Sequence, residues 1–298
     1  MQAVIIAGGL GTRLYELTHD KIPKSMIEIC GKPLLQWQIE TLKENGVDDI
    51  IVVVGHLGDL ILDKFGGIVK YYEEDEPLGT AGALPKIADL LEDEFLFIYG
   101  DLFFNIDIQR MMKFHHNHHG QGTVLTHPNS HMFDSDLVVC KYNFLIEDIV
   151  FKGEERPWWL HNQAMAGIYV FNKSILNVFP NQTRIDLEKD ILPKLSYLYS
   201  YRTSEFVKDV GTVERFNQVV EAIEKNIPEH RNLKNKQKAI FLDRDGTINY
   251  KNDLISDPTK FNIFPYAAEA IHMINESGYL AIVITNQPVI ARGLCSFK

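Results

Sequence analysis

Glycines, cations and carboxylates recur in the first part of the chain at points where short apolar runs end. The stretch Gly8-Gly9-Leu10-Gly11-Thr12-Arg13 directly follows the apolar run Ala3–Ala7. Backbone N–H groups without a neighbouring Cβ can wrap around phosphate oxygens, and a following arginine can form paired hydrogen bonds to them. The spacing fits neither a dinucleotide-binding fingerprint nor a P-loop. By itself this loop is equally consistent with a phosphate cradle and with a plain glycine turn.

A longer set of residues makes the interpretation more specific. The loop is followed by Leu14, Thr18, Pro23-Lys24-Ser25-Met26 and Gly31-Lys32-Pro33-Leu34. This ordered signature closely resembles that of the sugar-phosphate nucleotidyltransferase family, and the resemblance extends over nearly all of residues 1–225. It implies attack by a sugar 1-phosphate oxygen on the α-phosphorus of a nucleoside triphosphate, with release of pyrophosphate and no covalent enzyme intermediate.

The same resemblance gives catalytic roles to two cations and two carboxylates. Arg13 is expected to bind triphosphate oxygens in a forked arrangement, and Lys24 to place a positive charge between the α-phosphate and the sugar phosphate. Asp101 follows a buried strand, and Asp209 lies where the family has its second carboxylate. Because Mg²⁺ takes carboxylate ligands together with substrate phosphates, these two aspartates are expected to hold one Mg²⁺. Taken singly, all four would be ordinary surface, loop or capping residues.

Contacts to the nucleotide and the sugar also follow from the resemblance. The segment Glu76–Ala83 resembles the one whose backbone reads the base, and Thr80 also suits the cap of a following helix. The expected nucleotide-binding residues are Ala7, Gly8, Gly9, Gly11, Thr12, Arg13, Gly79 and Thr80. The expected sugar-phosphate-binding residues are Lys24, Gly167, Glu188 and Lys189. For Glu188 and Lys189, a solvated helix turn is the alternative.

Two stretches depart from the family pattern. Met165 stands where the family usually has Asn, just before Ala166-Gly167, so one sugar-hydroxyl contact lacks its usual side chain. The stretch Phe151–Glu154 departs from the usual Phe-x-Glu-Lys pattern, which leaves Lys152 only weakly assigned.

A second motif follows the apolar run Ala239–Leu242. The stretch Asp243–Thr247 matches the DxDGT motif of haloacid-dehalogenase-type phosphatases, and Thr285-Asn286 resembles their phosphate-binding motif. The resemblance is greatest to the histidinol-phosphate and heptose-bisphosphate branch. It implies that Asp243 is a nucleophile, that Asp245 is an acid/base, that both contact Mg²⁺, and that Thr285 and Asn286 bind phosphate.

The sequence stops at Lys298, before the lysine and the acidic metal motif of that phosphatase family would appear. We therefore expect an incomplete phosphatase with little activity. The presence of both motif sets in one chain still indicates which sugar is the substrate. A heptose-bisphosphate phosphatase would produce a heptose 1-phosphate, which the nucleotidyltransferase could use. We expect transfer from GTP to form GDP-D-glycero-D-manno-heptose. The alternatives are mannose 1-phosphate guanylyltransferase, another hexose 1-phosphate nucleotidyltransferase, a catalytically silent sugar-nucleotide-binding module, and a sugar-bisphosphate phosphatase.

Alternating segments must position these residues. Apolar runs lie at Ala3–Ala7, Ile50–Val54, Val69–Tyr72 and Phe95–Tyr99, and amphipathic segments at Leu34–Asn45, Leu57–Phe65, Ala81–Leu91 and Ile108–Asn117. This rhythm predicts an α/β fold with a doubly wound, mostly parallel, Rossmann-like sheet of the nucleotide-diphospho-sugar transferase type. Ligands bind such sheets beyond the carboxyl ends of the strands, where the glycine loop and Asp101 would meet.

The rhythm changes twice along the chain. Residues Gly122–Phe171 have strand-like runs without long helices between them, which predicts an antiparallel subregion. A helix is expected at Val213–Lys225, followed by a polar stretch. We predict a nucleotidyltransferase domain at 1–225, a linker at 226–238, and a partial α/β domain of the haloacid-dehalogenase type at 239–298, with a helix at Ala267–Ser277 and a strand at Leu280–Thr285.

Two clusters invite functional readings that we disfavour. His115 and His119 are one helical turn apart, yet no carboxylate or cysteine partner is evident from the sequence, so an exposed helix end is favoured over a metal site. Trp158-Trp159 fits stacking on a base or sugar, but packing of the loop on the domain or an oligomer contact fits equally well.

The composition sets outer bounds on the function. The 298 residues are 45% hydrophobic and 23% charged, which is globular composition, and no apolar run reaches the roughly 18 residues that span a bilayer. The three cysteines have neither disulfide nor metal spacing, which together with the absence of a signal-like leader favours the cytoplasm. A net charge of -10 argues against a nucleic-acid partner but leaves nucleotides open. A homo-oligomer is compatible with the sequence.

Overall fold

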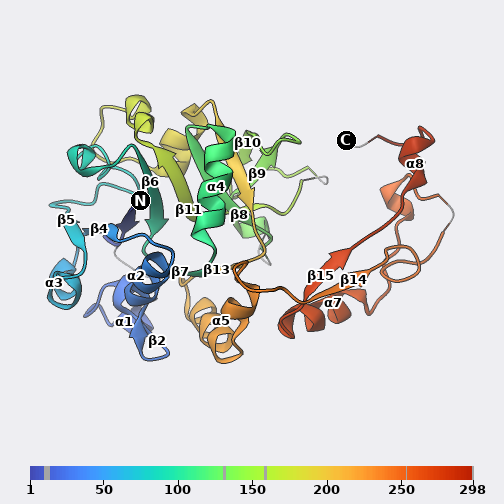
Figure 1. The fold of residues 1–298 in the computed structure, drawn as a ribbon, viewed down its shortest axis with the longest axis horizontal. Helices are drawn as coiled ribbons and strands as arrows, with labels where there is room; N and C mark the ends of the chain where they lie inside the picture. The colour runs from blue at the N-terminus through green and yellow to red at the C-terminus, as the bar shows by residue number, and fades with distance from the viewer. Residues whose placement is uncertain (10–13, 130–131, 158–159, 253, 297–298) are drawn as a thin grey trace. The chain divides into compact units, whose positions relative to one another are not determined.

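The structure is a computed structural model that describes residues 1–9, 14–129, 132–157, 160–252 and 254–296. It divides the chain into two units, Met1–Pro228 and Glu229–Lys298 (Figure 1). The division lies in the stretch where the sequence predicts a linker. Part of that stretch is regular, because Ile227–Arg231 form the short helix α6.

The larger unit contains most of the secondary structure. Its strands are β1 (Gln2–Ile6), β2 (Glu28–Ile29), β3 (Lys32–Pro33), β4 (Asp49–Val54), β5 (Lys70–Glu73), β6 (Glu94–Tyr99), β7 (Leu102–Asn105), β8 (Gly122–His127), β9 (Leu137–Cys140), β10 (Ile146–Val150), β11 (Ala164–Asn172), β12 (Leu198–Arg202) and β13 (Phe206–Asp209). Its other helices are α1 (Tyr15–Thr18), α2 (Leu34–Glu44), α3 (Gly58–Phe65), α4 (Ile108–His118) and α5 (Val213–Glu224). Short 3₁₀ helices and the π-helix Leu187–Ile191 connect them.

Most predicted helices form close to their expected bounds, and local capping explains two of the starts. The Asp107 carboxylate accepts the N–H of Arg110 at the start of α4, and the Thr212 hydroxyl accepts the N–H of Arg215 at the start of α5. The helix predicted at Ala81–Leu91 is wrong. That segment consists of turns that end in the 3₁₀ helix Ala88–Leu90, since Gly82 and Pro85 interrupt it and a proline removes a helical hydrogen bond.

The central strands are apolar on both faces because both faces are covered. Ala3 and Ile5 of β1 belong to one buried cluster, whereas Val4 between them belongs to another. This alternation follows from the two-residue period of a strand. Helices α2, α3 and α4 supply side chains to the first cluster, and the segments 78–91 and 175–195 cover the second. Both faces of the sheet are therefore covered, as the sequence predicts. The face covered by segments 78–91 and 175–195 packs against turns, 3₁₀ helices and a π-helix, with little α-helix.

The main sheet is mixed, which corrects the prediction of a mostly parallel sheet. Nine strands form it, and its main path runs β10-β9-β11-β6-β1-β4-β5. Strands β6, β1, β4 and β5 are parallel, but β11 pairs antiparallel with β6, β8 and β9. The parallel half follows from helical crossovers, and the antiparallel half lies in the stretch 122–172, where the chain reverses through loops.

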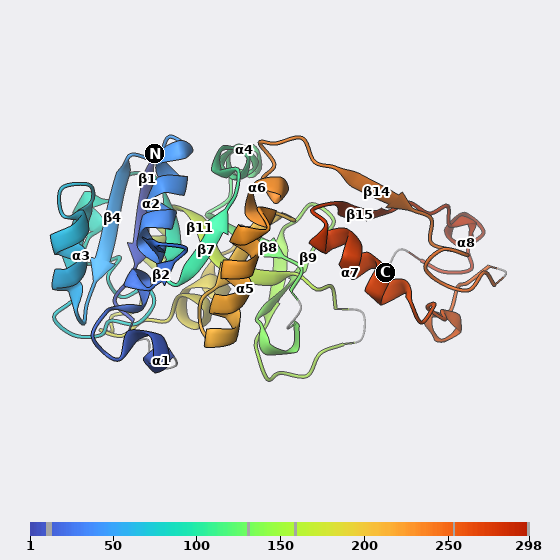
Figure 2. The same cartoon turned by 90° about the horizontal axis from the view of Figure 1, so that it is seen from below.

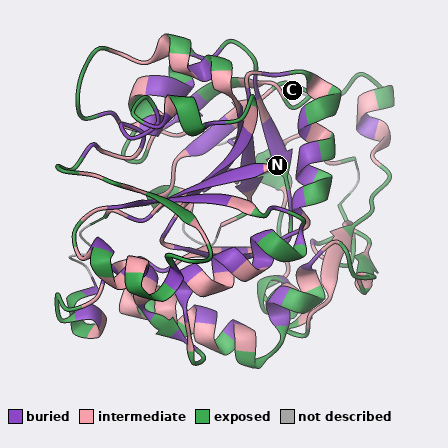
Figure 3. Cartoon of the chain, turned by 60° about the vertical axis from the view of Figure 1, so that its left-hand side comes forward, coloured by how far each residue is buried: buried purple, intermediate pink, exposed green. Residues whose placement is uncertain are grey.

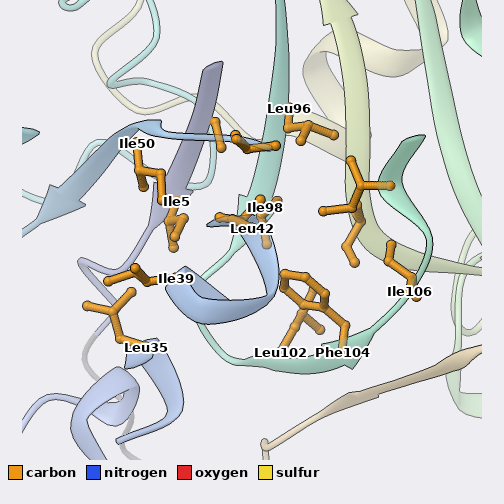
Figure 4. Close-up of a cluster of buried hydrophobic side chains, with 14 of the residues drawn as sticks. Ile5, Leu35, Ile39, Leu42, Ile50, Leu96, Ile98, Leu102, Phe104 and Ile106 are labelled. Atoms are coloured by element: carbon orange, nitrogen blue, oxygen red, sulfur yellow. The ribbon is translucent and has the colours of Figure 1, made fainter. Parts of the chain in front are cut away.

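Side chains from distant segments fill the core beneath α2. Leu35, Ile39 and Leu42 of this helix meet Ile5 of β1 and Ile98 of β6 (Figure 4). Figure 3 shows the central strands buried along much of their length, whereas the surrounding helices bury one side and expose the other. Burying a side chain of this size stabilises the fold by about 1.5–3 kcal/mol. The cluster thus fixes the sheet edge from which the loops project.

The smaller unit has a parallel pair of strands, β14 (Ala239–Leu242) and β15 (Leu280–Val283). Helix α7 (Ala267–Glu276) lies against β15, as Figures 1 and 2 both show. The short helix α8 (Pro288–Ala291) follows β15. These elements form close to the positions expected from the sequence. In neither unit does the described part of the chain include a helix long and apolar enough to cross a membrane.

Candidate active site

A cleft of about 760 Å³ opens where β1 and β6 end. Its described lining residues are Ile6, Ala7, Gly8, Gly9, Leu14, Lys24, Ser25, Glu74, Pro77, Gly79, Thr80, Tyr99, Gly100, Asp101, Arg184, Ile185, Asp186, Asp190 and Gly211. Seven of the residues predicted to bind or react are among them: Ala7, Gly8, Gly9, Lys24, Gly79, Thr80 and Asp101. The cleft lies at the carboxyl ends of parallel strands, where α/β sheets hold their ligands.

The start of the glycine loop lies against neighbouring backbone. A Cβ on Gly100 would lie 2.7 Å from the carbonyl oxygen of Ile6, so the ends of β1 and β6 approach closely only because this residue is glycine. Gly11, Thr12 and Arg13 lie outside the described residues. Their expected roles as phosphate ligands stay predictions.

Lys24 and Asp101 meet in the cleft although they come from different parts of the chain. The Lys24 ammonium group donates to Asp101 Oδ2 over 2.6 Å. Lys24 begins the 3₁₀ helix Lys24–Met26 directly after Pro23, and its side chain is only 13% exposed. A partly buried ion pair of this length has strong electrostatic coupling. The cleft therefore contains a cation and a carboxylate in direct contact.

Asp209 lies beside Asp101 through a small separate sheet. Strands β7 and β13 pair antiparallel with Asp209 opposite Leu102, and the N–H of Val210 donates to the carbonyl oxygen of Asp101 over 2.7 Å. Asp209 accepts from Arg215 Nη1 over 2.6 Å and does not line the cleft. The structure thus brings the two predicted metal ligands close together, with Asp101 just before β7 and Asp209 at the end of β13, and each is paired with a cation. The described residues contain no cluster of three or more His, Cys, Asp or Glu side chains suited to a metal ion.

The turn at Gly79 and Thr80 is fastened to the segment that precedes the π-helix. Gly79 has φ +85°, and a Cβ there would lie 2.4 Å from the carbonyl oxygen of Ile185. The Thr80 hydroxyl accepts the N–H of Leu187 over 2.7 Å. The sequence suggested that Thr80 caps a following helix, but the residues after Thr80 form turns. Thr80 links the expected base-reading segment to the expected sugar-reading segment.

Glu188 is a partly buried residue outside the described lining of the cleft. Its carboxylate accepts from the Tyr169 hydroxyl over 3.0 Å. Burial raises the pKa of Glu188 to about 7, the Tyr169 hydrogen bond opposes this shift, and the nearby Asp186 charge adds to it. Burial and the Glu188 charge raise the pKa of Tyr99, which does line the cleft, well above its usual value. Glu188 is thus neither a cleft-lining residue nor a solvated helix turn.

The remaining predicted sugar-side residues also stand back from the cleft lining. Gly167 has φ +73°, and a Cβ there would meet the Tyr99 ring at 2.7 Å, so this glycine makes room for Tyr99. Lys189 is exposed, and its backbone N–H donates to Asp186 Oδ1. Lys152 pairs with Asp134 on the surface.

Several cleft residues were not singled out from the sequence. They are Ser25, Glu74, Arg184, Asp186, Asp190 and Gly211. Glu74 directly follows β5, so the rule that ligands gather at carboxyl strand ends applies to it as well as to Asp101. Arg184, Asp186 and Asp190 flank or lie within the π-helix, and no sequence pattern identifies such a helix in advance.

The histidine cluster differs from the exposed helix end that the sequence suggested. His115 is buried, and its Nδ1 hydrogen-bonds the Thr123 hydroxyl at 2.9 Å. Burial lowers the pKa of His115. His116 and Glu94 make a surface contact of 2.8 Å. His115 is thus a core residue. Trp158 and Trp159 lie outside the described residues.

In the smaller unit, the two predicted motifs meet at the ends of β14 and β15. The Gln287 side-chain amide donates to Asp245 Oδ2 over 2.9 Å and to the Thr285 hydroxyl over 2.7 Å. Asp245 also receives hydrogen bonds from Arg244 and Asn249. Burial is the largest single effect on the pKa of Asp245 and raises it, but the hydrogen bonds from Asn249, Gln287 and Arg244 together outweigh burial and lower the pKa. Asp243, Thr285 and Asn286 are exposed at the same edge.

Known proteins resemble the larger unit. A mannose-1-phosphate guanylyltransferase catalytic subunit beta from Dictyostelium discoideum is 33% identical over 72% of this chain and 62% of its own length. A D-glycero-alpha-D-manno-heptose 1-phosphate guanylyltransferase from Campylobacter jejuni is 35% identical over 63% of this chain and 84% of its own length. The crystal structure of HddC from Yersinia pseudotuberculosis complexed with GMP-PN has a TM-score of 0.65 and 27% identity, covering 74% of this chain and 99% of HddC.

The matched region thus spans less than two thirds of the Dictyostelium protein but nearly all of HddC. Residues 2–226 match the family described as Nucleotidyl transferase, which covers the whole described cleft. The chain therefore belongs to the nucleotidyl transferase family.

Proposed function

We propose that the larger unit transfers the guanylyl group of GTP to a sugar 1-phosphate and releases pyrophosphate. The observation that carries this proposal is the cleft at the ends of β1 and β6, where Gly8, Gly9, Lys24 and Asp101 meet. An oxygen of the sugar phosphate attacks the α-phosphorus, and the bond from that phosphorus to the bridging oxygen of the pyrophosphate breaks. Such a reaction needs positioning and charge neutralisation more than covalent help from the protein.

Lys24 is the described cation best placed for this reaction. Its ammonium group lies at the cleft wall and is restrained by Asp101. A charge fixed beside the phosphates stabilises the transition state without reorganising during the reaction. Arg13 would contribute a second cation beside the triphosphate.

A divalent cation fits the carboxylates of this site. Asp101 directly precedes β7 and Asp209 ends the neighbouring strand β13, and both offer the oxygen ligands that Mg²⁺ prefers. Sites with only one or two protein carboxylates suit Mg²⁺, which takes further oxygens from substrate phosphates. When bound, Mg²⁺ would neutralise charge on the phosphate oxygens. Lys24 and Arg215 balance these carboxylates when the metal is absent.

A heptose 1-phosphate is the sugar substrate we favour. The similarity to the Campylobacter heptose 1-phosphate guanylyltransferase supports it, as does the phosphatase-like motif at Asp243. Mannose 1-phosphate is the alternative that the Dictyostelium protein supports. Glu188 does not line the cleft, so its influence on the sugar would pass through Tyr99, a cleft residue whose pKa is raised by burial and by the Glu188 charge.

A panel of nucleoside triphosphates crossed with sugar 1-phosphates, assayed by pyrophosphate release, tests the reaction. We expect the fastest release with GTP and D-glycero-D-manno-heptose 1-phosphate. Asp101→Asn should reduce that release by about 100-fold or more, since it removes a metal ligand and the partner of Lys24. Unchanged release in this variant would refute the catalytic assignment. Nucleotide binding without release in any combination would favour a silent binding module.

We propose a haloacid-dehalogenase-like fold for the smaller unit, with little hydrolytic activity. The parallel pair β14 and β15 and the Gln287 link between Asp245 and Thr285 support the fold assignment. Arg244 forms an ion pair with Asp245, the residue expected to act as acid/base. This ion pair engages the carboxylate that the hydrolytic reaction would need. Phosphate release from a heptose bisphosphate, compared between the chain and Asp243→Asn, tests this. Equal rates support a unit without hydrolytic activity, whereas faster release by the unsubstituted chain contradicts it.

A further inference from the structure

Gln38 is a polar residue on the apolar side of helix α2. Its position follows the helical spacing of Leu35, Ile39 and Leu42, which belong to the buried cluster shared with β1, β6 and β7 (Figure 4). Gln38 is only 1% exposed. An amide that has lost its contact with water needs hydrogen-bond partners within the protein. The contacts of Gln38 therefore indicate what it does in the fold.

The Gln38 amide holds the turn that carries Asp101. Its Nε2 donates to the carbonyl oxygen of Tyr99 over 2.9 Å and to that of Leu102 over 2.7 Å. Tyr99 ends β6 and Leu102 begins β7, so the two carbonyl groups lie on either side of Gly100 and Asp101. One side chain thus fastens both ends of this turn to α2.

The orientation of the amide follows from these two carbonyl groups. A flipped amide would place Oε1 against both carbonyl oxygens, and an acceptor cannot bond to another acceptor. In the observed orientation Oε1 is buried and has no hydrogen-bond partner among the described residues. An unpaired buried acceptor destabilises a fold, and an apolar side chain of similar length would not carry one. The contacts with the turn, and not the packing of α2, therefore account for an amide at this position.

Other contacts restrain the same turn. The N–H of Gly100 donates to the carbonyl oxygen of Ile6 over 2.9 Å, and the N–H of Val210 donates to the carbonyl oxygen of Asp101 over 2.7 Å. The Asp101 carboxylate lines the cleft, where it accepts from Lys24. The backbone around Asp101 is thus held by β1, by the residue after β13 and, through Gln38, by α2.

We propose that Gln38 is a positioning residue that fixes the direction of the Asp101 carboxylate toward a bound metal ion. This inference rests on the proposed guanylyl transfer, in which Asp101 is a ligand of Mg²⁺. Gln38 lies outside the described lining of the cleft, and it acts through the turn at residues 99–102. Residues behind a metal ligand orient that ligand, and their loss typically lowers metal affinity or activity by about 10- to 100-fold.

Gln38→Met tests this role, because methionine has a similar length and lacks both N–H donors. We expect the affinity for Mn²⁺, a probe for Mg²⁺ that electron paramagnetic resonance detects, to fall by about 10-fold or more. The kcat for pyrophosphate release should fall by a similar factor, since a misdirected carboxylate holds the metal poorly.

Thr41→Val is the matched control. Thr41 is a buried residue three positions further along α2, and its Oγ1 donates to the carbonyl oxygen of Phe104 over 3.4 Å. Phe104 lies within β7 and outside the turn, so this variant loses a contact between α2 and β7 without releasing Asp101. We expect unchanged Mn²⁺ affinity in Thr41→Val, and thermal unfolding of both variants compares their losses of stability.

A double-mutant cycle separates the positioning of Asp101 from a general loss of stability. If Gln38 acts through Asp101, Gln38→Met should weaken Mn²⁺ binding no further in a chain that already has Asp101→Asn. Additive losses would overturn the inference, and so would an equal loss of Mn²⁺ affinity in Thr41→Val. If Gln38→Met does not fold, Gln38→Asn carries the same comparison, because its amide is one methylene shorter and cannot reach both carbonyl oxygens.

The outcomes distinguish this inference from the proposed function, because Mn²⁺ binding does not require turnover. A loss of Mn²⁺ affinity in Gln38→Met, without pyrophosphate release by the unsubstituted chain, would support the positioning role and refute the proposed transfer. Pyrophosphate release by the unsubstituted chain, with unaltered Mn²⁺ affinity in Gln38→Met, would refute the role of Gln38 and leave the transfer in place.

Discussion

The Lys24 ammonium group and Asp101 Oδ2 are 2.6 Å apart, although 77 positions separate the two residues in the sequence. Lys24 is mostly buried and Asp101 is 35% exposed, so the pair lies at the boundary between the protein and the cleft. In this arrangement the carboxylate holds the cation in place, and the cation neutralises the charge of the carboxylate. The two residues therefore form one unit of the candidate site.

Lys24→Ala is expected to reduce pyrophosphate release by about 100-fold or more, because a fixed charge beside the phosphates is lost and Asp101 is left without its partner. Steady-state rates with varied sugar 1-phosphate measure the effect. Lys21→Ala serves as the control, since Lys21 is an exposed residue outside the described cleft lining. Equal losses in the two variants would exclude a specific role for Lys24.

Arg215→Ala is expected to strengthen metal binding. Arg215 pairs with Asp209 over 2.6 Å and competes with any cation for that carboxylate. A partly exposed ion pair is worth about 0.2–1 kcal/mol, so the affinity for Mn²⁺, used as a probe in place of Mg²⁺, should rise by about 1.4- to 5-fold. Electron paramagnetic resonance titration of free Mn²⁺ measures this. Lys225→Ala removes another cation near the end of α5, and it should leave Mn²⁺ affinity unchanged. Weaker binding in Arg215→Ala would instead mean that Arg215 positions Asp209.

Gly79→Ala is expected to destabilise the larger unit by about 1–3 kcal/mol, since φ is +85° and the new Cβ would lie 2.4 Å from the Ile185 carbonyl oxygen. The same shift would displace the turn that lines the cleft and weaken GTP binding. Gly67→Ala is the matched control, because a Cβ at Gly67 meets no atom within 4 Å. Chemical denaturation and GTP titration provide the two readouts, and a Gly79→Ala variant as stable as Gly67→Ala would contradict the strain argument.

Glu188→Gln is expected to change how stability depends on pH. Burial raises the pKa of Glu188 from 4.5 to about 7, so the folded chain keeps this proton where the unfolded chain has lost it. The contribution of Glu188 to the free energy of unfolding is therefore full below pH 4.5 and is lost as the pH rises through about 7. Urea denaturation across this range should show a smaller decline in the Glu188→Gln variant. A decline equal to that of the unsubstituted chain and of the control Glu73→Gln, which changes an exposed carboxylate, would refute the assignment.

Much of the fold could be predicted because period and composition are local properties. The runs that become β1, β4 and β6 are apolar throughout, and strands covered on both faces require that pattern. The failed helix at Ala81–Leu91 shows the limit. Its apolar spacing is helical, but Gly82 and Pro85 and the tie of Gly79 to Ile185 determine a series of turns instead. The antiparallel subregion at 122–171 was expected, but its union with the parallel strands through the pairing of β11 with β6 was not, because the sequence does not show which strands pair.

Some residues of the candidate site could be assigned from the sequence, whereas others could be identified only from the folded structure. Lys24 and Asp101 could be assigned from motifs, and the cleft contains both. Gln38 has no motif of its own, and its burial and its contacts with the carbonyl oxygens of Tyr99 and Leu102 exist only in the folded chain. The roles of Gly167 and Glu188 also depend on folding, since both act on the ring or the environment of Tyr99.

Residue types and short spacings are enough to identify the family signature, the alternation of strands and helices, and the cations and carboxylates available for phosphate chemistry. Which of these groups meet depends on the folded chain. Contacts such as that between Lys24 and Asp101 join strands and loops far apart in the chain, and the burial that raises the pKa values of Glu74 and Glu188 arises from packing of many segments at once.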